Sequence, residues 1–359
     1  MTKIGILTGG GDCAGLNTVI ASVVKTGVRR GVEFVGFYKG WNGVLDKKYR
    51  PLDLDAVRGI SHRGGTILGT TNHGRFNAKG SADGQTIPVE ILEEAKRNLD
   101  EMGVEGLIVI GGDGTLSGAL QLAELGVNIV GVPKTIDNDL SATDKTFGYS
   151  TAVDVAVESL DRIHTTASSH DRVFFVESMG RHSGWLALEA GLAANANAIL
   201  MPEFEVDIDS LIEFLRHRLT TRGSAIVTVA EGIELAETGS GQSLDGDYVE
   251  SEVRLAGVSN ALINEIERRA PGEFEMRGVV LGHTQRGGSP NAEDRILSKR
   301  YGAAALEAYL DGQFNHMVRL KNGQIETVLI AEATGEQKRV SKSHALYQTA
   351  QKLGVYLNG

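Results

Sequence analysis

Three glycine-rich loops contain the residues of this sequence that are best suited to chemistry. They are TGGGD at 8–12, GGDGT at 111–115 and PKTIDND at 133–139. Residues without a Cβ let backbone N–H groups close around phosphate oxygens, and the third loop adds the carboxylates of Asp137 and Asp139. Phosphate-binding backbone beside carboxylates that can hold Mg²⁺ and accept a proton is what phosphoryl transfer requires. We therefore expect a kinase.

The elements that must position these loops alternate between strands and helices. Strand-length apolar runs occur at 4–7, 34–37, 107–110, 129–132, 173–176, 225–230 and 279–281, and helical patterns at 16–30, 89–102, 116–125, 151–166, 210–221, 258–269 and 292–310. This alternation predicts an α/β fold with a parallel sheet covered on both faces. Ligands of such sheets bind beyond the C-terminal ends of the strands, where all three loops lie. Turns that need glycine for geometry alone would explain one such loop but explain three poorly.

Composition limits the partners and the compartment. The 359 residues suffice for two domains, and the formal net charge of -10 argues against a nucleic acid or an anionic membrane as partner. An anionic substrate therefore needs a local cluster of Arg, Lys and His. The single cysteine, Cys13, excludes an internal disulfide, and we expect it to fill a turn rather than act as a nucleophile. Without a signal peptide or a bilayer-length apolar stretch, we expect a soluble, cytoplasmic protein.

Further motifs narrow the class of kinase. GGDGT alone also resembles the nucleotide loop of NAD kinases and of diacylglycerol and sphingosine kinases, but it is the only element shared with them. TIDND at 135–139, MGRHSGW at 179–185 and LGHTQRGGSP at 281–290 together resemble the 6-phosphofructokinase family. The first glycine loop, RGGT at 63–66 and AEG at 230–232 add to the match, which runs in family order over nearly the whole chain.

The resemblance implies two Rossmann-like, three-layer α/β domains with parallel-rich sheets and an active site in the cleft between them. A large nucleotide-binding domain is expected from residues 1–148 and about 285–336, and a small sugar-phosphate-binding domain from 149–284 and 337–359. The substrate implied is fructose 6-phosphate, with ATP as donor, Mg²⁺ as cofactor and self-association to a homotetramer or dimer.

On the acceptor side, the resemblance makes Asp137 the general base that takes the proton from the sugar 1-hydroxyl. Arg172 and Arg277 are implied to reach in from a neighbouring subunit, so an isolated monomer should be inactive. A lone Asp would more often form an Asx-turn, and a lone Arg a surface ion pair. The expected sugar-phosphate contacts are Thr135, Asp137, Asp139, Arg172, Met179, Gly180, Arg181, Glu231, Arg277, His283 and Arg286, with Thr135, Arg181 and Arg75 also expected in catalysis.

On the donor side, Asp113 is the expected Mg²⁺ contact, because this cation prefers carboxylate and water oxygens. Trp41 stands where the ATP-using enzymes place an aromatic ring against adenine, and packing is an equal alternative. The expected donor contacts are Gly11, Trp41, Arg75, Gly112, Asp113, Gly114, Thr115, Gly118 and Lys134.

Two residues bear on the identity of the donor. Gly114 is typical of ATP users, because pyrophosphate users carry an Asp there that would repel the α-phosphate. Lys134 is typical of pyrophosphate users, although a lysine there can bind phosphate without excluding a nucleotide. An Asp at position 114 would exclude the nucleotide completely, whereas a Lys at position 134 only tunes the binding of phosphate. Gly114 therefore predicts ATP. Pyrophosphate as donor is the first alternative.

A second alternative is a catalytically silent regulatory subunit. Such subunits tend to lose the base or the phosphate contacts, whereas the present chain retains Asp113, Asp137, Arg172, His283 and Arg286. One position does depart from the familiar bacterial enzymes, which have an arginine where Asn72 stands. Arg75 or Lys134 could replace it, and we expect Arg75→Ala to lower kcat more than Lys79→Ala.

Overall fold

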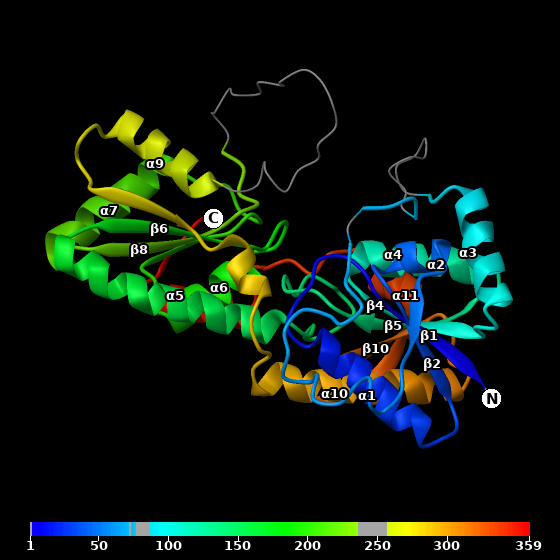
Figure 1. Cartoon of the computed structure of the whole chain (residues 1–359). Helices are drawn as coiled ribbons and strands as arrows, with labels where there is room; N and C mark the ends of the chain where they lie inside the picture. Colours follow the sequence, from blue (N-terminus) through cyan, green and yellow to red (C-terminus); the bar gives the residue numbers. More distant parts are fainter. Residues whose placement is uncertain (1, 72, 77–85, 236–256) are drawn as a thin grey trace. The chain divides into compact units, whose positions relative to one another are not determined.

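The structure is a computed structural model that describes residues 2–71, 73–76, 86–235 and 257–359. The chain divides into two compact units, each built around its own sheet (Figure 1). Unit 1 contains Met1–Ile136, Leu140–Thr151 and Arg286–Gln337, and unit 2 contains Asp137–Asp139, Ala152–Gln285 and Lys338–Gly359. The predicted α/β class with parallel-rich sheets is confirmed.

The sheet of unit 1 has seven strands in the order β11-β10-β5-β4-β1-β2-β3. Neighbouring strands are parallel from β10 to β2, while β11 and β3 pair antiparallel at the two edges. The strands are β1 (Lys3–Thr8), β2 (Glu33–Phe37), β3 (Tyr49–Pro51), β4 (Gly106–Gly111), β5 (Asn128–Pro133), β10 (His316–Lys321) and β11 (Gln324–Leu329).

Helices cover both faces of this sheet. In unit 1, α1 and α10 pack together on one face, and α2, α3, α4 and α11 lie over the other (Figure 1). Every residue of β4 is buried, as expected of a central parallel strand under two helical layers. The helices are α1 (Leu16–Val28), α2 (Trp41–Leu45), α3 (Val89–Glu101), α4 (Asp113–Glu124), α10 (Ala292–Leu310) and α11 (Ile330–Ala333).

Unit 2 holds a five-stranded, all-parallel sheet in the order β12-β7-β8-β6-β9. Helices α7 and α9 cover one face and contribute Leu211 and Leu262 to its core, while α6 packs on β7 and β8. The elements are α5 (Tyr149–His170), β6 (Val173–Ser178), α6 (Trp185–Ala193), β7 (Ala198–Leu200), α7 (Ile208–Arg222), β8 (Ala225–Ala230), α9 (Val258–Arg269), β9 (Met276–Val280), the 3₁₀ helix η2 (Gly282–Arg286), α12 (Ala345–Lys352) and β12 (Tyr356–Leu357).

The predicted elements are present with ends that differ by a few residues, whereas strands β3, β7, β10, β11 and β12 and helices α2, α6 and α11 were not predicted. Helix α4 begins at Asp113, three residues before the predicted start, because an acidic first residue suits the positive end of the helix dipole. GGDGT is therefore a helix N-terminus. Strand β9 begins at Met276 rather than 279, and strands as short as β3 and β7 fall below the length that periodicity can detect. Within the described residues, no helix is both long and apolar enough to cross a bilayer.

Candidate functional site

The three predicted loops follow the C-terminal ends of β1, β4 and β5, which are neighbours in the sheet of unit 1. Packing alone explains two of the glycines, because a Cβ on Gly9 or Gly111 would lie about 2.5 Å from side-chain atoms of Thr115. It does not explain Gly114, where a Cβ would meet nothing within 4 Å. The backbone at Gly114 thus faces open space at the first turn of α4, where N–H groups are available to an anion.

Two cations lie against the first glycine loop. Lys134 is buried, and its Nζ donates to the carbonyl oxygen of Gly11 at 2.6 Å. The guanidinium of Arg286 packs against Gly11, where an added Cβ would be only 2.6 Å from one of its terminal nitrogens. The same guanidinium donates to the carbonyl oxygen of Asp12 at 3.3 Å. The backbone N–H of Lys134 donates to Gly111, which joins the second and third loops. The structure therefore brings the predicted Gly11, Lys134 and Arg286 together and supplies the local positive charge that an acidic chain needs for an anionic ligand.

Asp113 is placed at the start of α4 with one carboxylate oxygen, Oδ1, accepting from the backbone N–H of Gly335 at 2.9 Å. No group of three or more His, Cys, Asp or Glu side chains that could hold a metal occurs among the described residues. A single carboxylate fits a Mg²⁺ ion whose other ligands are phosphate and water oxygens. A single carboxylate would not suffice for a metal ion whose ligands are mainly protein side chains.

Trp41 and Gly118, both expected at the nucleotide, are connected by Phe76. The Phe76 ring stacks on Trp41 with centroids 4.2 Å apart, and a Cβ on Gly118 would come within 3.2 Å of it. Trp41 is 8 % exposed and belongs to the core of unit 1. Trp41 is thus a packed residue in this structure, and a purine could reach its face only where Phe76 gives way.

Arg75 forms a bidentate pair with Glu94 of α3, at 2.8 and 2.9 Å. Both side chains are partly exposed, so this is an ion pair at the surface of unit 1. Asn72, where the familiar bacterial enzymes have an arginine, and Lys79, the expected control for Arg75, lie outside the described residues.

In unit 2, the acceptor loop (residues 137–139) is fixed by bonds to its backbone. The Ser183 hydroxyl donates to the carbonyl oxygen of Asp137 at 3.0 Å. The backbone N–H of Lys338 donates to the carbonyl oxygen of Asp139 at 2.7 Å. Oδ1 of Asp137 is shielded from solvent. Thr135, just before this loop, accepts at its carbonyl oxygen from the Thr146 hydroxyl in unit 1.

The predicted sugar contacts of unit 2 lie on turns that pack against each other. Gly232 allows the carbonyl of Arg181 to approach so closely that any Cβ would overlap it, which places Glu231 beside the Arg181 turn. The backbone N–H of Met179 donates to the side-chain oxygen of Gln285 at 2.8 Å. Gly180 has a φ of 122°, which only glycine adopts readily. His283 lies exposed on η2, two residues before Gln285 along the chain.

Arg172 and Arg277 share one partner in the single chain. Both donate to the carboxylate of Glu275, at 2.7 and 2.9 Å, beside the edge strand β9. The Glu275 pKa is held below its usual range mainly by the hydrogen bond from Arg172. The alternative to a binding role for these two arginines was an ion pair at the surface. Within a single chain, both of them form such a pair with Glu275.

Burial shifts the pKa values of two titratable groups near the loops. Burial raises the pKa of the Cys13 thiol to about 12, so this side chain fills the turn as an inert group. Burial, reinforced by Arg181 and Arg339, lowers the pKa of His182 within the MGRHSGW motif.

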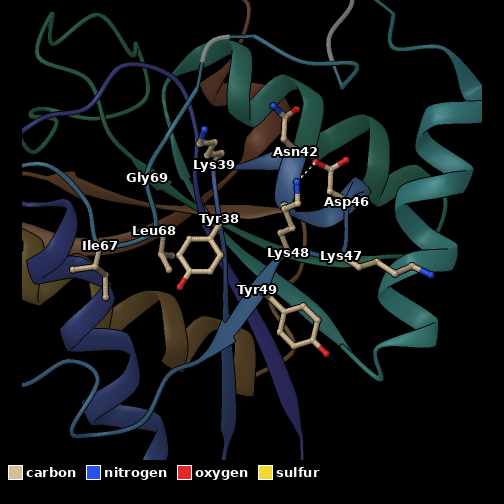
Figure 2. A pocket seen from close by; sticks show the side chains of 11 residues that line it. Tyr38, Lys39, Asn42, Asp46, Lys47, Lys48, Tyr49, Ile67, Leu68 and Gly69 are labelled. Carbon is tan, nitrogen blue, oxygen red and sulfur yellow. Dashed lines mark hydrogen bonds and ion pairs between the residues drawn. The ribbon is translucent and has the colours of Figure 1, made fainter.

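A surface pocket of about 780 Å³ lies beside the first glycine loop in unit 1 (Figure 2). Gly69 lines it, and the next residue, Thr70, donates to the carbonyl oxygen of Gly10 at 2.5 Å. Tyr38, Lys39 and Tyr49 also line it, and the ammonium of Lys48 pairs with Asp46 at its wall. None of the residues predicted for the site lines this pocket.

Several residues that hold these loops in place were not predicted from the sequence. Lys338 follows a polar stretch without any motif, and Phe76 stands in a segment that reads only as a loop. Ser183 and Gln285 lie inside the motifs MGRHSGW and LGHTQRGGSP, and this position was the only indication in the sequence that they belong near the site. What each of them contacts depends on tertiary packing.

Comparison with known proteins identifies relatives over the whole chain. The family model described as Phosphofructokinase matches residues 3–309. The chain is 48% identical to the pyrophosphate–fructose 6-phosphate 1-phosphotransferase of Streptomyces coelicolor, covering 99% of each. It is 42% identical to an ATP-dependent 6-phosphofructokinase of Clostridium perfringens, covering 98% of this chain and 97% of that protein.

Solved structures agree on the fold. A chain of phosphofructokinase from Saccharomyces cerevisiae superposes with a TM-score of 0.77 and 31% identity, covering 93% of this chain and 45% of the yeast chain. The pyrophosphate-dependent phosphofructokinase of Marinobacter aquaeolei gives a TM-score of 0.81 over 100% of this chain and 93% of its own, but at 20% identity this similarity concerns the fold alone. Because named relatives use either donor, similarity does not decide between ATP and pyrophosphate.

Proposed function

Because this chain belongs to the phosphofructokinase family, we propose that it transfers the γ-phosphoryl group of ATP to the 1-hydroxyl of fructose 6-phosphate, as a glycolytic enzyme of the cytoplasm. The observation that carries the choice of ATP is the open space in front of Gly114. An Asp side chain there would fill the space with negative charge next to the donor phosphates. With glycine, that space is left for an α-phosphate.

In the proposed mechanism, Asp137 accepts the proton of the sugar 1-hydroxyl while the hydroxyl oxygen forms a bond to the γ-phosphorus and the bond to the β-phosphate oxygen breaks. The backbone at Gly112 and Gly114, together with Lys134, binds the donor phosphates. Mg²⁺, which Asp113 would contact, neutralises phosphate charge when bound. Met179, Arg181 and Glu231 hold the sugar, and His283 and Arg286 its 6-phosphate.

The test of this proposal is the formation of fructose 1,6-bisphosphate from fructose 6-phosphate, ATP and Mg²⁺. Related hexose phosphates replace fructose 6-phosphate in a control reaction. Failure to form the bisphosphate with any phosphoryl donor would contradict the proposed activity and favour the silent-subunit alternative.

Pyrophosphate remains the second candidate donor, because Lys134 places a buried cation on the first glycine loop and a 48% identical relative is named for this donor. Pyrophosphate needs no space beyond its two phosphates. It would also leave the stack of Phe76 on Trp41 undisturbed.

We further propose a homotetramer in which Arg172 and Arg277 of one subunit complete the site of another. Arg172→Ala and Asp137→Asn subunits should each be inactive alone. After mixing and reassembly in equal amounts, about one quarter of the sites would contain both intact partners and recover activity. Recovery is measured as fructose 1,6-bisphosphate formation against unmixed controls. A mixture as inactive as its components would show that each subunit supplies its own arginines.

Arg75 is proposed to replace the arginine that is missing at Asn72. Arg75→Ala should then lower kcat about tenfold or more, because a cation near the transferring phosphoryl group stabilises its transition state. Arg58→Ala is the control, since Arg58 is a highly exposed arginine of the same unit with only a weak pair to Asp55. Steady-state kinetics that show equal, small effects for both variants would refute the assignment.

A further inference from the structure

Lys338 connects the segment after α11 to the acceptor loop in two ways. Its backbone N–H donates to the carbonyl oxygen of Asp139 at 2.7 Å, and its ammonium donates to Oδ1 of Asn138 at 3.0 Å. One residue earlier, Gln337 forms an antiparallel bridge with Leu140. The segment thus runs alongside the exit of the loop and contacts two of its three residues.

The bond to Asn138 fixes an unusual backbone conformation. Asn138 has a φ of 51° and is only 6 % exposed. The left-handed region is unfavourable for residues other than glycine, although Asn tolerates it better than most. Because Asn138 stands between Asp137 and Asp139, its φ and ψ set the direction of one carboxylate relative to the other. A bond that holds its side chain therefore holds the orientation of Asp137.

Lys338 is itself held in place by a buried tryptophan. The indole N–H of Trp185, which is 5 % exposed, donates to the carbonyl oxygen of Lys338 at 2.8 Å. The ammonium of Lys338 lies 5.7 Å from the centre of the Trp185 ring, within range of a cation–π interaction.

The MGRHSGW motif that contains Trp185 also fixes the acceptor loop directly. The Ser183 hydroxyl binds the carbonyl oxygen of Asp137, and the carboxylate of Glu203 accepts from the N–H groups of both Gly184 and Val340. The acceptor loop is thus held between the turn at 183–185 and the segment at 338–340, and these two are tied to each other.

We propose that Lys338 is a positioning residue for phosphoryl transfer, which holds the acceptor loop through Asn138 so that Asp137 meets the sugar hydroxyl in the reactive geometry. The inference rests on the proposed function in that Asp137 is the base. The bonds that define this role join Lys338 to the side chain of Asn138 and to the backbone of Asp139, so its loss should reduce the rate of the chemical step more than the binding of the sugar phosphate.

The test compares three full-length variants. Lys338→Met keeps the aliphatic stem and removes the ammonium, and Lys338→Arg restores a cation. Lys342→Met is the matched control, because the Lys342 ammonium makes the same kind of contact, 5.7 Å from the Phe204 ring, in the same segment. Activity is measured with whichever donor the wild-type enzyme uses, so that the choice of donor does not affect the comparison.

We expect Lys338→Met to lower kcat about 10- to 100-fold, as small misplacements of catalytic groups do, with KM for fructose 6-phosphate changed much less. Lys338→Arg should recover most of the rate, and Lys342→Met should match wild type. A kcat within twofold of wild type in Lys338→Met, or an equal loss in Lys342→Met, would overturn the proposal.

Two further measurements separate positioning from general destabilisation and from failure of the proposed function. In a double-mutant cycle, Asn138→Ala and Lys338→Met should have strongly non-additive effects on kcat, because they remove the same bond. Amide hydrogen exchange in residues 135–140 should be faster in Lys338→Met than in Lys342→Met, and this readout does not require activity. Additive effects together with unchanged exchange would show that the contact positions nothing.

Discussion

Asp137→Asn should lower kcat about 10³-fold, which corresponds to about 4 kcal/mol of transition-state stabilisation. The amide has the size and shape of the carboxylate but cannot accept the proton of the sugar 1-hydroxyl. The loop that carries it is fixed by Ser183 and Lys338 through backbone atoms, so the substitution should leave the fold intact. Steady-state kinetics with fructose 6-phosphate would measure the loss, and circular dichroism would confirm folding.

Asp139→Asn is the control for this prediction, because Asp139 belongs to the same loop and carries the same charge. Its effect should be clearly smaller if Asp137 is the base. A folded Asp137→Asn enzyme that retained more than a tenth of the wild-type kcat, or an Asp139→Asn enzyme that lost more, would assign the proton transfer to another group.

Gly114→Asp should impair the use of ATP, lowering kcat/KM for ATP about 10²-fold or more through repulsion between like charges. The enzyme should still fold, because a Cβ at this position meets no atom within 4 Å and Gly114 is not among the residues with positive φ. Pyrophosphate should bind at least as well as before, since Lys134 remains on the first glycine loop. Initial rates with the two donors would measure the change.

Gly114→Ala separates charge from bulk in this experiment. It adds a Cβ without a carboxylate and should keep most of the activity with ATP. If alanine were as harmful as aspartate, the backbone rather than the charge would be critical. An aspartate enzyme that still used ATP would show that residue 114 does not select the donor.

The sequence predicted the parts of the molecule that local patterns determine. The buried run at 107–110 and the glycines after it predicted both β4 and the phosphate-binding turn, because a central parallel strand is apolar throughout. Helices α9 and α10 have the predicted bounds, since Gly257 and Asn291 mark their starts and the apolar period marks their length. The motifs were sufficient to recognise the family.

What local patterns could not predict are contacts between segments distant in the sequence. From the sequence, Trp41 could equally stack on a ligand or pack in the core. Its stacking on Phe76 shows that it packs, but no motif in the sequence marks Phe76 as its partner. The bond between Lys338 and Asn138 joins residues 200 positions apart, so only the folded chain reveals it. The pairing of Arg172 with Glu275 likewise joins residues that are far apart in sequence, each directly before one of the neighbouring strands β6 and β9.

The most direct test of the account is the rate of fructose 1,6-bisphosphate formation by the wild-type enzyme, with Mg²⁺ and with ATP and pyrophosphate compared side by side. Activity is expected with ATP and little or none with pyrophosphate, which would make Lys134 a residue that only tunes phosphate binding. Activity with pyrophosphate alone would contradict it, and would show that Lys134 outweighs the open space at Gly114.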